Sequence, residues 1–210
     1  MWISSRLRVA NYLSKTRDIK DARVFLEKVA SRLASSKILV TSDKLRSYPQ
    51  ALLEVFGVAD KTWSDWKSFP EGFLYAQIDK ERVHGHLVAV DRKPVVGTMD
   101  QIQAVLDEDG LSAVINTSFV ERDNLSVRQH NGRVVRKTLS YSKSWRMHQN
   151  AIDFEDALHN FVRAHSSLRL LLTTPQGRRL WQERTPAMAA GITDHPWSIR
   201  ELVSYRPPPR

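Results

Sequence analysis

Two carboxylates and a long run of cations are the parts of this sequence that could do chemistry. Asp43 follows the short apolar stretch KILV, and Glu121 lies in the segment VERDNLSVRQH. Between Asn124 and Gln149 there is no Asp or Glu. The same span contains six cations: Arg128, Arg133, Arg136, Lys137, Lys143 and Arg146. Carboxylate oxygens suit Mg²⁺, and Lys and Arg bind phosphate, so the pattern would suit a metal site beside a polyanion.

Both carboxylates also have a plain structural explanation. Asp43 could cap the helix that follows it, and Glu121 lies three residues after Ser118, which is the spacing of a capping box. Because caps are common, spacing alone favours this explanation. In open α/β sheets, however, functional groups gather beyond the carboxyl ends of strands, where we expect Asp43 and Glu121 to lie. At this point both interpretations remain open.

The cation run favours a polyanion over a chance cluster of charge. Arg128 follows Glu121 by seven residues, which is two helical turns, so both side chains would share a helix face. Globular surfaces normally mix charges of both signs, and a stretch with many cations and no acid departs from that norm. Tyr141 and Trp145 lie within the run and could stack on bases or only pack. The sequence therefore predicts that this region binds a polyanion such as DNA.

Composition is typical of a basic globular protein. The 210 residues carry a formal charge of +9, which favours a nucleic acid partner. No apolar run approaches the roughly 20 residues that span a bilayer, so we expect no membrane partner. There are no cysteines, which excludes disulfides and Cys-ligated zinc and suits the cytoplasm. His84 and His86 would share a strand face, but no third zinc ligand is evident, so we expect a structural or surface role.

The elements that would position these residues alternate between strand and helix. Apolar spacing predicts helices over 19–35, 44–57, 98–110, 118–131 and 150–172, with two short ones in 185–203. Strands are expected over 2–13, 37–40, 81–97 and 112–116. Residues 58–80 are expected to form a loop over the core. This alternation predicts an α/β sheet.

Four segments of the chain resemble a known family. TSDKLRSYPQAL, from Thr41, resembles the segment around the second catalytic aspartate of bacterial insertion-sequence transposases. INTSFVERDNLSVRQHNGRVVRKTLSYSK, from Ile115, is similar to the segment that carries their catalytic glutamate. Further along, HNFVRAHSSLR and RTPAMAAGITDHPWSIRELVSYRPPP resemble the helix that follows and the end of the same group. From Thr41 to the C-terminus, the chain therefore resembles the DDE transposases.

The resemblance implies a ribonuclease H-like, integrase-like fold and a two-metal phosphoryl transfer that cuts and joins DNA. It assigns Asp43 and Glu121 as the second and third catalytic, metal-binding acids, with Mg²⁺ or Mn²⁺ as cofactor. Arg128 becomes the cation that follows the glutamate, and Asp123 matches a variable position without a ligand role. Lys44 stands where the family usually has glycine. The implied partners are transposon ends and target DNA, in a nucleoid-associated cytoplasmic location.

The N-terminus departs from the family pattern. The family's first aspartate lies on a first strand, in a segment like D-E-x-W-S-F. The acids that precede Asp43 here all fall in or beside a predicted helix: Asp18, Asp21 and Glu27. We therefore expect an N-terminally truncated ribonuclease H-like mixed sheet, flanked by helices and lacking the usual first strand. Residues 1–172 would form this partial catalytic domain, and 173–210 an extension that packs on it.

The missing aspartate leaves two main functions open. With two carboxylates the chain would bind metal weakly and would be inactive alone, as a fragment of a transposase catalytic domain. Alternatively, it is a non-catalytic, transposase-derived DNA-binding or regulatory protein, which could form homo-oligomers or mix with full-length transposase. An unrelated basic enzyme would require the long motif matches to be coincidental.

Overall fold

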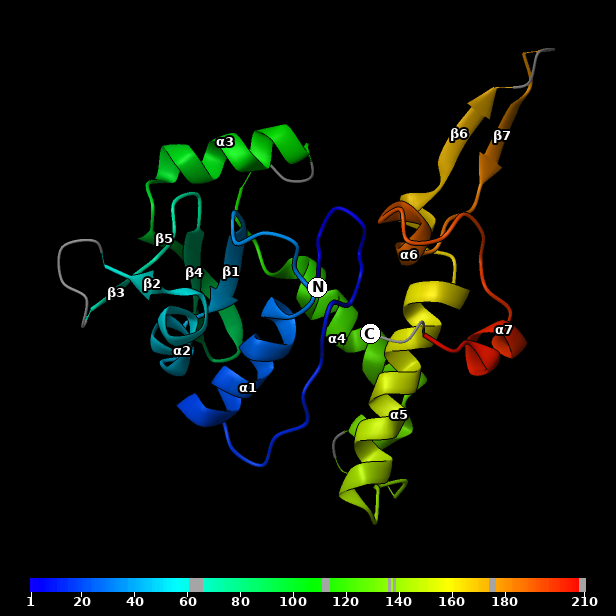
Figure 1. The fold of residues 1–210 in the computed structure, drawn as a ribbon, viewed down its shortest axis with the longest axis horizontal. Coiled ribbons are helices and arrows are strands. Elements are labelled where there is room, and N and C mark those ends of the chain that lie inside the picture. Colours follow the sequence, from blue (N-terminus) through cyan, green and yellow to red (C-terminus); the bar gives the residue numbers. More distant parts are fainter. Residues whose placement is uncertain (61–65, 111–113, 136, 138, 174–176, 208–210) are drawn as a thin grey trace. The chain divides into compact units, whose positions relative to one another are not determined.

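The fold comes from a computed structural model (Figure 1). It describes residues 1–60, 66–110, 114–135, 137, 139–173 and 177–207. The chain divides into two compact units, which we name the sheet unit (Tyr12–Arg122) and the helical unit (Met1–Asn11 with Asp123–Arg210). Helix α4 (Ser118–His130) carries the chain from the sheet unit into the helical unit.

The sheet unit is built on three strands. Its elements are α1 (Ile19–Ala30), β1 (Leu39–Asp43), α2 (Ser47–Phe56), β2 (Val58–Ala59), β3 (Lys67–Ser68), β4 (Leu74–Val83), β5 (His86–Val96) and α3 (Met99–Asp109). The strand order is β1-β4-β5, with β1 parallel to β4 and β4 antiparallel to β5. β2 and β3 form a separate short pair.

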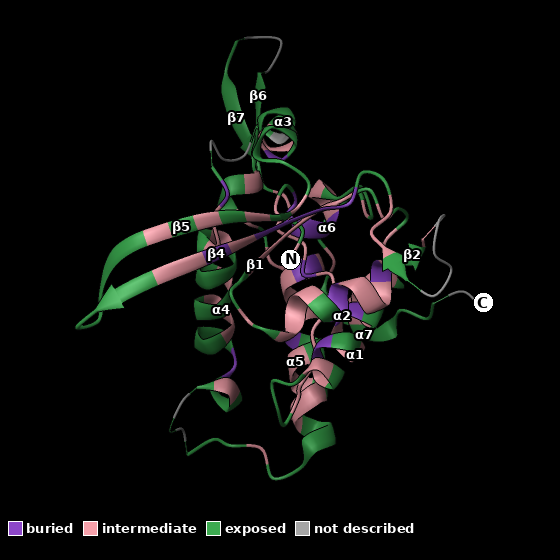
Figure 2. Cartoon of the chain, turned by 90° about the vertical axis from the view of Figure 1, so that its left-hand side faces the viewer, coloured by how far each residue is buried: buried purple, intermediate pink, exposed green. Residues whose placement is uncertain are grey.

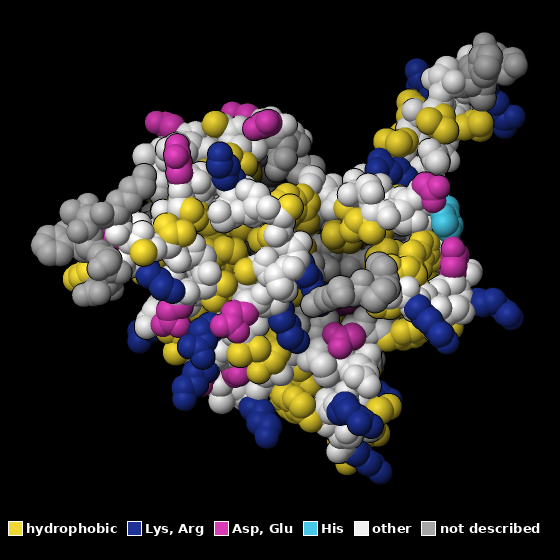
Figure 3. All heavy atoms as spheres, viewed as in Figure 1, with side chains coloured by type: hydrophobic (Ala, Val, Ile, Leu, Met, Phe, Trp, Pro, Cys, Tyr) yellow, Lys and Arg dark blue, Asp and Glu magenta, His cyan; other side chains and the backbone are white. Residues whose placement is uncertain are grey.

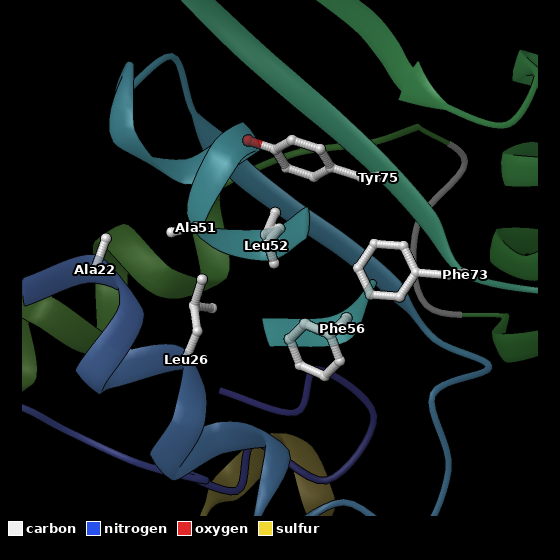
Figure 4. Close-up of a cluster of buried hydrophobic side chains, with 7 residues drawn as sticks. All are labelled: Ala22, Leu26, Ala51, Leu52, Phe56, Phe73 and Tyr75. Atoms are coloured by element: carbon white, nitrogen blue, oxygen red, sulfur yellow. The ribbon is translucent and has the colours of Figure 1, made fainter. Parts of the chain in front are cut away.

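Each face of the sheet has its own apolar cluster. Figure 4 shows residues of α1 and α2 gathered around Phe73 and Tyr75, next to the sheet. The second cluster joins alternate residues of β4 to Ile102 of α3 and to Ile115. Because successive strand side chains point to opposite faces, β4 can supply both clusters. Figure 2 shows that burial fades toward the tip of the β4–β5 hairpin, which is exposed.

This arrangement is a mixed α/β sheet flanked by helices, as the resemblance predicted, and it is consistent with a ribonuclease H-like fold. Local signals account for the helix ends. Asp18 caps α1 by accepting from the Asp21 amide. Thr98 and Gln101 form a capping box on α3, and Gly110, with a φ of 61°, ends it in the left-handed region.

The helical unit centres on one long helix and the turn that continues it. After the second part of α4 come η1 (Gly132–Val134), α5 (Trp145–Ala157), the π-helix η2 (Leu158–Val162), η3 (Ser166–Leu168), β6 (Leu170–Thr173), β7 (Arg179–Gln182), α6 (Pro186–Ala189) and α7 (Ile199–Ser204). β6 and β7 form a two-stranded antiparallel hairpin. α6 and α7 both pack against η2.

Several sequence expectations were wrong. Residues 2–13, all described, form no strand beyond an isolated bridge between Trp2 and Leu7. The segment is instead fixed by Asn160, which accepts from the Arg8 amide and donates to the Arg8 carbonyl, both at 3.0 Å. The helix expected over 150–172 starts earlier, at Trp145, and its last turn becomes η2, which ends at Val162.

Two other expectations concern the sheet unit. Part of the loop expected over 58–80 is strand β4, which begins at Leu74 with three buried residues in succession. In the strand expected over 112–116, residues 111–113 lie outside the described residues, and Val114–Asn116 are not in a strand. The division at Leu172 into domain and extension stays a prediction.

Candidate active site and basic surface

Asp43 is the last residue of β1, at its carboxyl end, and it is exposed. It is not a helix cap, because the N-cap of α2 is Arg46. Asp43 pairs in register with Ile78 of β4. Paired residues of neighbouring strands share a face of the sheet, and so do residues two apart on one strand. Asp43 therefore lies on the same face as Ile78 and Lys80.

A chain of hydroxyl groups fixes the strand just before Asp43. The Ser42 hydroxyl donates to the Asp43 carbonyl at 2.7 Å and lies 2.9 Å from the Tyr75 hydroxyl. The Gln77 amide donates to the same Tyr75 oxygen at 2.9 Å. Burial raises the pKa of Tyr75, so its hydroxyl stays protonated and can donate to Ser42. This network holds the backbone that carries the Asp43 carboxylate.

Glu121 lies in the first turn of α4, as predicted. Its Oε1 atom accepts from the Lys80 ammonium of β4 and, at 2.9 Å, from the Thr117 hydroxyl. These two hydrogen bonds, Lys80 first, lower the pKa of Glu121. The expected capping box with Ser118 is replaced, since the Ser118 hydroxyl donates to Asn116 at 2.6 Å.

Lys80 contacts Glu121 and lies near Asp43 in the strand register. Its backbone lies two residues beyond the partner of Asp43 on β4, a step of about 7 Å along the strand. Its ammonium group binds Glu121. Asp43 and Lys80, the partner of Glu121, thus share one face of the sheet.

The donor set suits a hard cation in kind, because both groups offer carboxylate oxygens. It is small, however. Among the described residues, no group of three or more His, Cys, Asp or Glu side chains could hold a metal ion. Asp43 and Glu121 therefore stay predictions as ligands.

Strand β4 also takes part in a second ion pair between a lysine and a carboxylate. Lys44 donates to Asp79 of β4 at 2.5 Å. This hydrogen bond raises the pKa of Lys44. Both side chains are exposed, at 68% for Lys44 and 46% for Asp79. The lysine after Asp43 thus binds a neighbouring carboxylate on β4.

The predicted DNA-binding cations belong to the helical unit. The described ones are all exposed: Arg128, Arg133, Lys137, Lys143 and Arg146. Arg136 lies outside the described residues. Figure 3 shows Lys and Arg side chains around the start of α5, where the run ends. Tyr141 and Trp145 within the run are also exposed, at 65% and 48%. Both are therefore accessible to a ligand, and stacking on bases stays a prediction for them.

Sequence reasoning missed one cluster, a buried ionic network in the helical unit. Arg8 is 7% exposed, and its guanidinium forms ion pairs with three acids, Asp123, Glu155 and Asp156. Asp123, expected to have no ligand role, accepts three hydrogen bonds from Arg8. Glu155 also binds Arg163. These partners lie more than a hundred residues from Arg8, so no sequence spacing could have revealed them.

One comparison with known proteins found a match. Residues 100–162 match the family model of IS1 transposases, a span that includes Glu121 and the whole cation run but not Asp43. Searches of curated proteins and of solved structures returned no match. Among the described residues, no helix has the length and apolar character to cross a membrane. The match covers less than half of the chain, and over that span it agrees with the sequence resemblance and supports an insertion-sequence transposase of the DDE type.

Proposed function

We propose that this chain is a DDE transposase catalytic fragment that acts on DNA strands in transposition. One observation carries the proposal. Glu121 opens helix α4 inside the matched segment, and its partner Lys80 lies on the sheet face that Asp43 shares. In open α/β sheets, side chains that act on a ligand gather at the carboxyl ends of strands, which is where Asp43 lies.

Asp43 and Glu121 are the residues that would hold a divalent cation such as Mg²⁺ or Mn²⁺. When bound, such a cation neutralises charge on a transferring phosphate and lowers the pKa of a bound water. The chain itself contributes the positioning. Ser42 and Tyr75 fix the strand end at Asp43, and Thr117 orients the Glu121 carboxylate.

Two carboxylates fall short of the three that hold a metal pair in the family. We therefore expect the chain alone to bind the cation weakly and to leave DNA uncut. The test is incubation of the purified chain with terminal-repeat DNA and Mg²⁺, beside Glu121→Gln. No nicked or joined product is the expected result. Products that disappear in Glu121→Gln would show that the fragment is active and that this expectation is wrong.

DNA binding is the part of the proposal that the helical unit supports. The described cations of the run are exposed and therefore free to meet phosphates. Each phosphate contact releases counterions, so the logarithm of affinity should fall by several units per unit of log salt concentration. A flat plot would remove this surface from the proposal. Lys143→Gln and Arg146→Gln together should reduce the slope, while Lys20→Gln and Lys37→Gln, outside the run, should leave it unchanged.

A second candidate is a non-catalytic, transposase-derived DNA-binding or regulatory protein. The observation that favours it is the small acid set, since no described cluster offers three carboxylates to a metal. Under this reading the chain would occupy transposon ends or join oligomers of a full-length transposase. Salt-dependent DNA binding that is the same with and without Mn²⁺, and in Glu121→Gln, would favour this candidate over the first.

A further inference from the structure

Lys80 is the cation that binds Glu121, one of the two residues of the proposed metal site. Its side chain is 24% exposed, and its ammonium binds Oε1 of Glu121. Thr117 donates to the same oxygen. Two donors on one carboxylate oxygen occupy the lone pairs that a divalent cation would use there.

The strand register places Lys80 on the sheet face that Asp43 shares. Lys80 follows Ile78, the register partner of Asp43, by two residues, and both point to the same sheet face. Its antiparallel partner Val90 packs against the apolar cluster on that face, which fixes the direction of the Lys80 side chain. A cation held by both carboxylates would have to share this space with the ammonium group.

We propose that Lys80 is a built-in counter-ion that competes with a divalent cation for Glu121. The proposal rests on the proposed metal role of Glu121 and adds a regulation of that site. With the cation absent, the ammonium neutralises the carboxylate and holds α4 against β4. A divalent cation that takes Oε1 displaces the ammonium, so Lys80 raises the cation concentration at which the site fills.

The chain offers a matched control for this idea. Lys44 and Asp79 form a second lysine–carboxylate pair that also involves β4, but neither carboxylate nor ammonium of that pair contacts Glu121 in the described contacts. Lys44→Met removes one positive charge near the same sheet edge. Lys80→Met removes the charge that binds Glu121. Any difference between the two variants therefore reports the direct contact and not the net charge.

The experiment is a Mn²⁺ titration of the full chain, with free Mn²⁺ read by electron paramagnetic resonance. Exposed ion pairs are weak, so Lys80→Met should tighten Mn²⁺ binding by about two- to fivefold. Lys44→Met should bind as the unchanged chain does, and Lys80→Arg, which keeps the charge, should too. Adding Glu121→Gln to Lys80→Met should abolish the gain. Unchanged or weaker binding by Lys80→Met overturns the proposal.

The same titration separates this inference from the proposed function. If Mn²⁺ binds and Glu121→Gln weakens it, but Lys80→Met has no effect, only the counter-ion role fails. If Mn²⁺ binding is absent, or is insensitive to Glu121→Gln, the metal role of Glu121 and the counter-ion role fail together. A second readout is acetylation of lysines followed by mass spectrometry. Mn²⁺ should speed the acetylation of Lys80 and leave the acetylation rate of Lys44 unchanged. If Lys80 is acetylated at the same rate with and without Mn²⁺, displacement of its ammonium is contradicted.

Discussion

Two carboxylates of helix α4 stand two residues apart and have opposite surroundings. Glu121 has a side chain that is 53% exposed, and it is held by one ammonium group and one hydroxyl. The Asp123 side chain is 15% exposed and accepts three hydrogen bonds from the guanidinium of Arg8. Glu121 belongs to the sheet unit and Asp123 to the helical unit.

The difference separates a carboxylate that can exchange partners from one that cannot. An exposed ion pair in water is worth little and can be replaced by another cation at low cost. A buried pair has lost its hydration, so removing one partner strands a charge in a medium of low dielectric. On this physical ground Glu121 is available to a ligand, while Asp123 holds the N-terminal segment to α4.

Arg8→Met should give the largest loss of stability. It removes the cation shared by Asp123, Glu155 and Asp156 and leaves buried acids without it. Loss of one partner of a buried ion pair typically costs about 3–5 kcal/mol in the free energy of unfolding. Urea unfolding followed by circular dichroism measures the change. Lys44→Met, in an exposed pair, is the control and should cost less than about 1 kcal/mol.

If the two substitutions cost the same, burial would not be what distinguishes the two classes of ion pair. If Arg8→Met lowers the free energy of unfolding by less than about 1 kcal/mol, water or a rearrangement must stabilise the acids that have lost their cation.

The matched pair Asp123→Asn and Glu121→Gln tests the comparison directly. Each change removes a charge and keeps the shape of the side chain. Asp123→Asn weakens charge-assisted hydrogen bonds inside the network and should cost about 1.5–3 kcal/mol. Glu121→Gln should change the free energy of unfolding by less than about 1 kcal/mol. The same urea titration measures both, and a larger loss for Glu121→Gln would reverse the assignment of roles.

Asn160→Ala should have a smaller effect than loss of Arg8. Asn160 is buried and binds the amide and carbonyl of Arg8, which substitutes for strand pairing in that segment. Two unsatisfied backbone groups that gain partial access to water should cost about 1–2 kcal/mol. Hydrogen exchange at the Arg8 amide should become faster in the variant. Gln50→Ala, on an exposed face of α2, is the control and should leave both quantities unchanged.

These contacts also show how far sequence reasoning could go. The alternation of elements predicted an α/β sheet, and the helix start near Ser118 placed Glu121 in its first turn, because both depend on short-range patterns. That the sheet is mixed came from the family resemblance. Arg8 and Asp123 are 115 residues apart, and no local spacing records such a contact. The loose alternation in residues 2–13 predicted a strand. The backbone amide and carbonyl of Arg8 instead form hydrogen bonds with the Asn160 side chain, in place of a neighbouring strand. Lys80 next to Glu121 was equally invisible, since their pairing needs both β4 and α4.

The smallest predicted effect concerns His195, which forms exposed ion pairs with Asp194 and Glu201 in the helical unit. Its Nδ1 lies 2.6 Å from Asp194 and its Nε2 lies 2.9 Å from Glu201, in the first turn of α7. A ring that faces carboxylates with both nitrogens must be protonated to donate to both. Hydrogen bonds to Asp194 and then to Glu201 raise the pKa of His195 above its ordinary value of 6.5. The same contacts lower the pKa values of Asp194 and Glu201.

The sign of the pH dependence follows from these shifts. The contribution of His195 is fully present below about pH 6.5 and is lost as the pH rises through its raised folded-state pKa. The contributions of the two acids are lost as the pH falls through their lowered pKa values. An NMR titration of the His195 ring should therefore give a midpoint above 6.5, which Asp194→Asn and Glu201→Gln each move down. A midpoint at or below 6.5 would contradict the contacts. Exposed ion pairs contribute little to stability, whichever unit they belong to. The free energy of unfolding should therefore change only slightly as the pH passes through the pKa of His195, and a steep change would contradict this rule.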